Sequence, residues 1–169
     1  MSLPEPIVVV ALGSNLGDSR GILEEAFQRL QALSPTAIQR SSIWETEPVD
    51  CPPGSPPFAN AVVVMGVASG ETAGSLLGKL QALEVEFGRR PKEVMNEPRP
   101  LDLDLILFGR ECRNQPGLIL PHPRARLRRF VLGPLCEIAP ELPFPAEGKT
   151  ARELLAGLPP DQEPRARSR

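Results

Sequence analysis

Apolar and polar side chains alternate along the second half of the segment from Asn96 to Arg110, and this alternation predicts a β-strand. One face of the expected strand is apolar throughout and carries Leu101, Leu103, Leu105 and Leu107. The opposite face has two carboxylates followed by two large apolar groups, in the order Asp102, Asp104, Ile106 and Phe108. Two aspartates inside a strand work against local propensity, and such conflicts are typical of functional sites.

Regular patterns elsewhere predict further strands and helices. Apolar runs rich in valine predict strands over 7–12 and 58–68, looser alternation predicts one over 37–46, and a short strand is expected over 118–120. Apolar residues at helical spacing predict helices over 19–30, 72–87, 130–138 and 151–158. Asp18 or Ser19 and Thr150 are candidate helix caps, and Gly88 is expected to end the second helix.

The order of these elements predicts an α+β fold, a ferredoxin-like α/β sandwich in which helices cover a mainly antiparallel sheet. A chain of 169 residues with 41% hydrophobic content is large enough for one domain with its own core. We expect this single domain to span residues 1–158. The polar, arginine-rich segment 159–169 is expected to be a disordered C-terminal tail.

Charge and composition narrow the range of partners. A formal net charge of −2 favours neither nucleic acid nor an anionic membrane, and no apolar run approaches the ~20 residues that a membrane span needs. The N-terminus lacks the pattern of a signal peptide, and Cys51, Cys112 and Cys136 are too far apart for a metal motif. We therefore expect a cytoplasmic monomer that binds small molecules, not nucleic acid or membranes.

Asp102 and Asp104 are candidate metal ligands. Their backbone positions would lie about 7 Å apart in a strand. Mg²⁺ favours one or two carboxylates together with substrate phosphates, and Arg99 could bind a phosphate through two parallel hydrogen bonds. Alternation alone is equally compatible with a half-solvated strand that carries two exposed acids.

Other candidate groups are few. The chain shows no pattern for a Ser-His-Asp or Cys-His nucleophile, and His122, between two prolines, could be structural or could bind a phosphate. The loop 13–17 lacks the Gly-Lys-Ser/Thr ending of a P-loop, so we interpret it as a tight turn, with a backbone contact from Gly13 to a ligand left open. Paired aspartates, several arginines and no obvious nucleophile are typical of phosphoryl transfer.

Several motifs together resemble one enzyme family. The most specific run is Pro98-Arg-Pro-Leu-Asp-Leu-Asp104, followed by Leu120-Pro-His122 and Arg128-Arg-Phe130. Four further motifs match in the same order and spacing, at 12–17, 45–48, 58–61 and 83–89. On these residues the segment 7–144 resembles the 6-hydroxymethyl-7,8-dihydropterin pyrophosphokinases of the folate pathway.

The resemblance implies transfer of the β,γ-pyrophosphate of ATP to the pterin hydroxymethyl group, with release of AMP. It implies two Mg²⁺ ions held by Asp102 and Asp104, and catalytic roles for these aspartates together with Arg89 and Arg99. The ATP-binding residues that it implies are Glu84, Arg89, Arg99, Leu105, His122 and Arg128. The pterin-binding residues that it implies are Gly13, Thr46, Val49, Phe58, Asn60, Asp102 and Phe130, with the two phenylalanines stacked on the pterin.

Three positions depart from the family pattern. Asn96 stands where the family often has Trp, Pro91 where a second basic residue is common, and Pro123 where many members have Tyr. We therefore expect an active enzyme with altered lid behaviour, in which Lys92 or Arg90 replaces the missing charge.

Two other classes of protein stay open. A ligand-binding or scaffold protein of the same fold would release no AMP and would tolerate Asp102→Asn. A metal-dependent nucleotidyl transferase or nucleotide hydrolase would release pyrophosphate or ADP, and it would not need the set of Phe58, Asn60 and Phe130.

Overall fold

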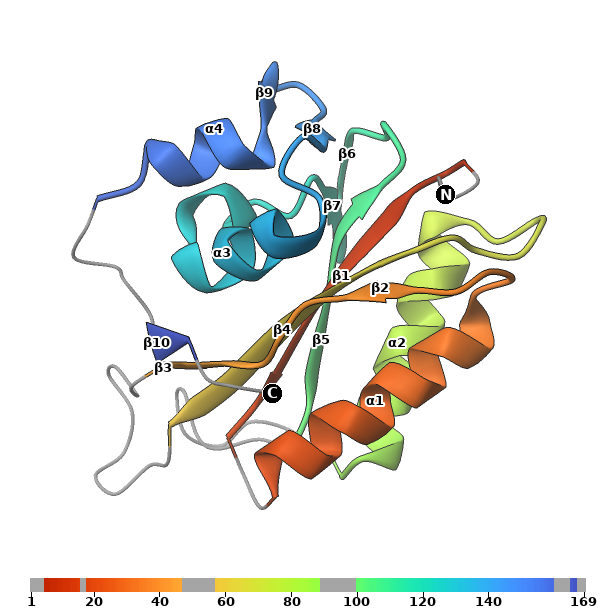
Figure 1. Cartoon of the computed structure of the whole chain (residues 1–169). Coiled ribbons are helices and arrows are strands. Elements are labelled where there is room, and N and C mark those ends of the chain that lie inside the picture. The colour runs from red at the N-terminus through yellow and green to blue at the C-terminus, as the bar shows by residue number, and fades with distance from the viewer. Residues whose placement is uncertain (1–4, 16–17, 47–56, 89–99, 160–164, 167–169) are drawn as a thin grey trace.

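The computed structural model of the chain describes residues 5–15, 18–46, 57–88, 100–159 and 165–166. Its centre is a six-stranded sheet in the order β10-β3-β4-β1-β5, with β2 also paired to β4 (Figure 1). Every pairing is antiparallel. The strands are β1 (Val8–Ser14), β2 (Gln39–Arg40), β3 (Trp44–Thr46), β4 (Phe58–Met65), β5 (Asp102–Phe108) and β10 (Arg165–Ala166).

Helices cover both faces of this sheet (Figure 1). Helices α1 (Ser19–Leu33) and α2 (Ala73–Glu86) pack on one face, and α3 (Arg129–Ile138) packs on the other, with α4 (Ala151–Ala156) and the short 3₁₀ helix η1 (Ala125–Leu127) beside it. Each face has its own apolar cluster. In β1, Val8 and Val10 belong to the cluster with α1 and α2, whereas Val9 belongs to the cluster with α3. The predicted ferredoxin-like α/β sandwich with a mainly antiparallel sheet is confirmed.

Two small hairpins complete the fold. Strands β6 (Arg113–Gln115) and β7 (Leu118–Leu120) form one, and β8 (Pro143–Phe144) and β9 (Lys149–Thr150) form the other. The chain that leaves β7 is tied to the edge strand β5, because the backbone N–H of His122 donates to the carbonyl of Ile106 at 2.9 Å. This bond places His122 beside the strand that carries the paired aspartates.

The helix boundaries follow from local capping chemistry. The carboxylate of Asp18 accepts the N–H of Gly21 at 3.2 Å and caps α1. Thr72 and Thr150 form reciprocal capping boxes at the starts of α2 and α4. Gly88 follows α2 with φ of 101°, a left-handed conformation that glycine adopts without strain. The predicted caps at Asp18 and Thr150 and the predicted stop at Gly88 are confirmed.

Some predicted boundaries are wrong. We expected the chain to turn at Gly13, but strand β1 continues to Ser14, because Gly13 pairs with both neighbouring strands and Ser14 still pairs with β4. The expected strand over 37–46 is divided into β2 and β3, β4 ends at Met65, and α4 ends at Ala156. Strand β6 carries the polar sequence Arg-Asn-Gln and has no pattern by which it could be recognised.

The alternation of β5 breaks at Ile106. Successive residues of β1 pair with Leu105 and Leu107, so Ile106 is an extra residue on β5. Ile106 and Leu107 both join the apolar cluster beneath α3, and Phe108 joins the cluster beneath α1 and α2. The prediction for Leu107 and Phe108 was therefore wrong, since a β-bulge reverses the alternation after it.

The C-terminal segment contributes one short strand. Arg165 and Ala166 pair with Glu45 and Trp44 as β10, within the segment for which we predicted a disordered tail. The boundaries of the domain stay a prediction. No helix in the described part of the chain is long and apolar enough to cross a membrane.

Candidate active site

A row of polar residues crosses three adjacent strands on the face covered by α3. Gly13 in β1 pairs with Asn60 in β4 on one side and with Asp102 in β5 on the other. A Cβ atom added to Gly13 would lie 3.3 Å from Oδ1 of Asn60 and 4.0 Å from Cβ of Asp102, so both side chains rise on the same face. Gly13 carries no side chain and is partly exposed, and we refer to the place above it, between the amide of Asn60 and the carboxylate of Asp102, as the slot.

Two aromatic side chains lie on the side of the sheet that carries this slot. Phe58 precedes Asn60 by two residues in β4 and shares its face, and Phe130 lies in the first turn of α3, above the same face. Both rings are half-buried. Thr46, at the end of β3, lies opposite Phe58 in the register. A flat ligand in the slot would meet apolar ring faces and, at its edge, the donor and acceptor of Asn60.

Asp104 continues the row along β5. It follows Asp102 by two residues, before the bulge, so the two half-buried carboxylates share a face. The guanidinium of Arg128 lies 5.5 Å from the centre of the Phe130 ring, in cation–π contact. Burial lowers the pKa of Arg128, and the charges of Asp104 and Asp102 oppose this shift. Arg128 thus lies near both the aspartate pair and the ring of Phe130.

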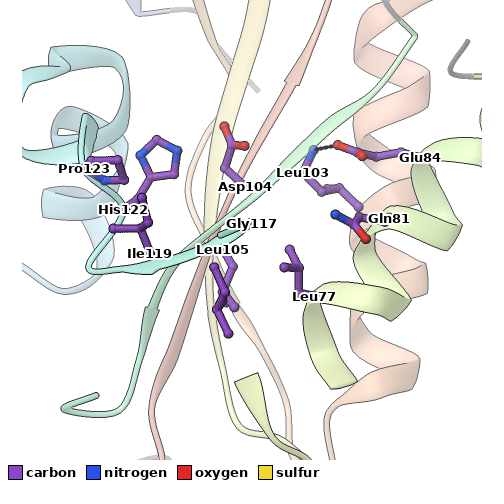
Figure 2. Close-up of a pocket in the computed structure, with 11 residues that line it drawn as sticks. Leu77, Gln81, Glu84, Leu103, Asp104, Leu105, Gly117, Ile119, His122 and Pro123 are labelled. Carbon is purple, nitrogen blue, oxygen red and sulfur yellow. Dashed lines mark hydrogen bonds between the residues drawn. The ribbon is translucent and has the colours of Figure 1, made fainter. Parts of the chain in front are cut away.

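The His122 imidazole lies close to Asp104 (Figure 2). Its Nδ1 accepts the backbone N–H of Arg124 at 3.2 Å, so a neutral ring carries its proton on Nε2. Burial lowers the pKa of His122; the charge of Asp104 opposes this shift, whereas Arg128 and Arg124 reinforce it. A neutral imidazole with Nε2–H free to donate is suited to bind a phosphate oxygen.

A pocket of about 350 Å³ opens where α2, β5 and β7 meet. Figure 2 shows Leu77, Gln81 and Glu84 on the α2 side of this pocket and His122 and Pro123 on the opposite side. Residues 103–105 of β5 form its wall, so Leu105 and the aspartate at 104 both line it. The carboxylate of Glu84 is buried and accepts the backbone N–H of Leu103 at 2.7 Å.

The structure therefore brings most of the predicted residues together in two adjoining places. Gly13, Asn60 and Asp102 form the slot, with Phe58 on the same face of β4 and Phe130 on α3 above that face, and Glu84, Asp104, Leu105 and His122 line the pocket. Arg128 lies between the two places. Arg89, Arg99 and Val49 lie outside the described residues, as does the lid expected after Gly88.

Sequence reasoning missed several residues of the pocket wall. Leu77 and Gln81 on α2 face Gly117 and Ile119 of the hairpin across the edge of β5. Leu77 was interpreted as a core residue because it fits the helical spacing. The sequence around such residues does not identify them as pocket residues, since the cavity arises where three separate segments meet.

The donor set fits the metal that the resemblance implies. Asp102 and Asp104 offer two carboxylates on one face, close to the cationic Arg128. Mg²⁺ uses one or two protein carboxylates and completes its octahedron with water and substrate phosphates. Two carboxylates on one strand face therefore match this ion.

Solved structures of related folds are found among bifunctional proteins. "Crystal Structure Analysis of the HPPK-DHPS in complex with substrates" aligns with a TM-score of 0.68 and 12% identity, covering 89% of this chain and 44% of that chain. A Plasmodium falciparum HPPK-DHPS triple mutant with pteroate aligns with a TM-score of 0.66 and 15% identity, over 89% of this chain and 42% of that one. The chain thus spans less than half of these solved chains, and at this identity they show the fold.

Sequence comparison is more specific. Curated 2-amino-4-hydroxy-6-hydroxymethyldihydropteridine pyrophosphokinases from Pseudomonas aeruginosa and Bacillus subtilis are 38% and 40% identical to this chain. The first alignment covers 90% of this chain and 91% of the relative, and the second covers 80% of each. The family model described as 7,8-dihydro-6-hydroxymethylpterin-pyrophosphokinase matches residues 9–140. The chain therefore belongs to the 7,8-dihydro-6-hydroxymethylpterin-pyrophosphokinase family of enzymes.

Proposed function

We propose that this protein transfers pyrophosphate from ATP to the hydroxymethyl group of 6-hydroxymethyl-7,8-dihydropterin and releases AMP, as a step of folate biosynthesis. One observation carries the proposal. Asp102 borders the slot beside Gly13 and Asn60, whereas Asp104, two residues along the same strand face, lines the pocket beside His122. Ligands in the slot and in the pocket would therefore meet at the aspartate pair, where a group could pass from one to the other.

The slot is proposed to bind the pterin. Phe58 and Phe130 would stack on its two faces, and the amide of Asn60 would pair with the donors and acceptors of its edge. Thr46 would add a hydroxyl, and the backbones of Gly13 and Val49 would complete the site. Gly13 suits this role because any side chain there would enter the slot next to Asn60.

The pocket is proposed to bind ATP. Glu84 and Leu105 would position the nucleotide, and the Nε2–H of His122 would donate to a phosphate oxygen. Arg128, Arg89 and Arg99 would bind the phosphates and stabilise the charge that spreads over the transferring group. Arg128 is included in this set because its charge interacts with those of both aspartates.

Asp102 and Asp104 would hold two Mg²⁺ ions, which when bound neutralise phosphate charge and orient the reacting groups. The chain's own contribution is to place the pterin hydroxyl in line with the β-phosphorus. The bond from the hydroxymethyl oxygen to the β-phosphorus forms as the bond between that phosphorus and the oxygen bridging it to the α-phosphate breaks. AMP leaves with the bridging oxygen, and the proton of the hydroxymethyl group is released to solvent. The cytoplasmic location and the monomeric state stay predictions.

The decisive experiment measures AMP release by the purified protein with Mg²⁺, ATP and 6-hydroxymethyl-7,8-dihydropterin. We expect AMP formation to depend on the pterin, and to fall at least ~100-fold in Asp102→Asn and in Asp104→Asn, because each variant loses a carboxylate proposed to hold Mg²⁺. Release of ADP or pyrophosphate, or AMP formation that does not depend on the pterin, would point to the transferase or hydrolase class instead. Unchanged activity of both variants would exclude the proposed roles of the two carboxylates.

A further inference from the structure

Trp44, the single tryptophan of the chain, is in direct contact with the backbone of α3 at Gly133. A Cβ atom added to Gly133 would lie 2.7 Å from Cη2 and 2.8 Å from Cζ3 of the indole, closer than Cβ atoms approach other atoms in proteins. The outer edge of the indole thus occupies the space that a side chain at position 133 would need. Trp44 and Gly133 are complementary in shape, and a side chain at position 133 would displace the indole.

A second contact joins the same two segments. The carboxylate of Glu137 accepts the backbone N–H of Ser42 at 2.9 Å and the hydroxyl of Ser42 at 2.8 and 2.9 Å. Ser42 precedes Trp44 by two residues, and Glu137 follows Gly133 by one helical turn, so the two contacts follow one another along the same line. The segment that leads into β3 and α3 are therefore held together at two points.

Continued along α3 and across the sheet, this line of contacts reaches residues of the proposed pterin slot. Phe130 precedes Gly133 by three residues and lies on the same side of α3, about 4.5 Å further along the helix axis. On the sheet, Trp44 pairs with Asn60, and therefore stands in the row formed by Asn60, Gly13 and Asp102. Because Phe130 and Gly133 belong to one helix, a change in the distance between Gly133 and the indole would also move the Phe130 ring relative to this row.

The Nε1 of the indole is buried and has no hydrogen-bond acceptor among the described residues. A buried N–H without a partner costs about 1–3 kcal/mol. Phenylalanine would bury no N–H, but it would not reach as far toward Gly133.

We propose that Trp44 is a positioning residue of the pterin site, which fixes the height of Phe130 through its contact with Gly133. This inference rests on the proposed function, because it concerns the same slot. It makes part of the affinity for the flat ligand depend on a contact outside the slot. It makes Gly133 the matched half of the pair, since only a residue without a side chain accommodates the indole.

The test compares Gly133→Ala, Trp44→Phe and the double variant. Michaelis constants for pterin and ATP come from AMP release, and dissociation constants for 6-hydroxymethylpterin come from calorimetry. We expect Gly133→Ala to weaken pterin binding about tenfold, the equivalent of ~1.4 kcal/mol, and to leave the KM for ATP within about twofold. The smaller ring in the double variant makes room for the methyl group, so pterin affinity should return to within about threefold of the wild type.

Gly78→Ala is the matched control, because Gly78 also lies inside a helix and a Cβ added there meets nothing within 4 Å. It should leave both KM values unchanged. A Gly133→Ala effect of equal size on pterin and ATP, or additive effects in the double variant, would overturn the proposal and leave a purely structural contact. If Gly133→Ala does not fold, Trp44→Phe alone decides: pterin affinity reduced about threefold supports the proposal, and unchanged affinity contradicts it.

The calorimetric arm separates this inference from the proposed function. A wild type that forms no AMP but binds the pterin would refute the proposed reaction, yet the variants would still show whether Trp44 positions Phe130. A wild type that forms AMP, with variants whose pterin affinity is unaltered, would support the reaction and refute the inference. A wild type that neither forms AMP nor binds the pterin would refute both.

Discussion

The buried carboxylate of Glu84 accepts the backbone N–H of Leu103 at 2.7 Å, and this bond ties α2 to the edge strand β5. Leu103 lies between the two aspartates in the sequence, so the bond acts on the stretch of backbone that carries both. An edge strand has backbone groups that no neighbouring strand can satisfy, and here a side chain supplies the acceptor. Glu84, predicted to position the nucleotide, thus also supports the strand of the proposed metal ligands.

Glu84→Ala should therefore weaken both the fold and the reaction. Without the carboxylate, the N–H of Leu103 is left unsatisfied, which should lower the free energy of unfolding by about 1–3 kcal/mol. The same loss of support should lower kcat, because the aspartates would no longer be held in place. Urea unfolding and AMP release measure the two effects.

Glu84→Gln is the matched control for this prediction, because its amide oxygen keeps an acceptor within reach of Leu103. Its loss of stability should be less than about half the loss in the alanine variant, since the hydrogen bond survives without the charge of the carboxylate. Equal stability of the two variants would show that the bond to Leu103 contributes nothing measurable.

Gly13→Ala should act on the pterin and not on ATP. The new methyl group would lie 3.3 Å from Oδ1 of Asn60, so the amide must shift by a few tenths of an ångström, and the slot becomes shallower. We expect the KM for the pterin to rise about tenfold, ~1.4 kcal/mol, while the KM for ATP serves as the internal control. An equal rise of both KM values would show that Gly13 has no specific effect on pterin binding.

Features that depend on neighbours in the sequence could be predicted. Asp18 and Thr150 were recognised as helix caps because a cap is formed between a side chain and backbone within three residues. The aspartate pair and the motifs around Phe58 and Phe130 were found because their residue types and spacing are specific. Their shared face follows from the strand period and the register.

Features that depend on contacts between distant segments could not be predicted. The bulge at Ile106 exists only in the pairing of β5 with β1, and its effect on Leu107 and Phe108 has no sign in the sequence. Trp44 is an aromatic residue in a short strand, and only the position of α3 shows why Gly133 must face it. The pocket wall likewise requires α2 and β7 to meet across an edge strand.

His122 should contribute to ATP binding as a neutral donor. His122→Ala should raise the KM for ATP about tenfold through the loss of one hydrogen bond to a charged phosphate, and leave the KM for the pterin unchanged. His122→Gln should lose less, because its amide can replace the Nε2–H. If alanine and glutamine behave alike, the imidazole makes no such bond.

The pH dependence of stability tests the environment of His122 separately. Burial lowers its pKa below the ordinary 6.5, so the unfolded chain takes up a proton at a higher pH than the folded protein does. The stability that the neutral ring contributes is therefore complete above 6.5 and is lost as the pH falls through the lower folded value. The wild type should lose stability relative to His122→Gln between about pH 7.5 and 5.5, as measured by thermal unfolding. A constant difference over this range would contradict the lowered pKa.

Substitution of Glu71 should change the stability of the protein and leave catalysis unaltered. Its side chain, 4% exposed, precedes α2 and forms an ion pair with Lys79 at 2.7 Å, and it also accepts the hydroxyl of Ser75. Burial alone would raise the pKa of Glu71, but the hydrogen bonds from Lys79 and Ser75, together with the charge of Lys79, outweigh burial and lower this pKa below 4.5. The folded state therefore binds the proton less readily than the unfolded chain does.

Glu71→Gln should consequently lower the free energy of unfolding by about 1 kcal/mol near neutral pH, the upper range for a pair with one exposed partner. The contribution of the wild-type carboxylate is complete above 4.5 and disappears as the pH falls through the lower folded value. Thermal unfolding of both proteins at about pH 7 and pH 3.5 should show a gap that closes in acid. Glu25→Gln removes the same charge from an exposed position on α1 and controls for net charge. A gap that persists unchanged in acid would mean that the glutamine alters packing at the start of α2, not the ionic network around Glu71.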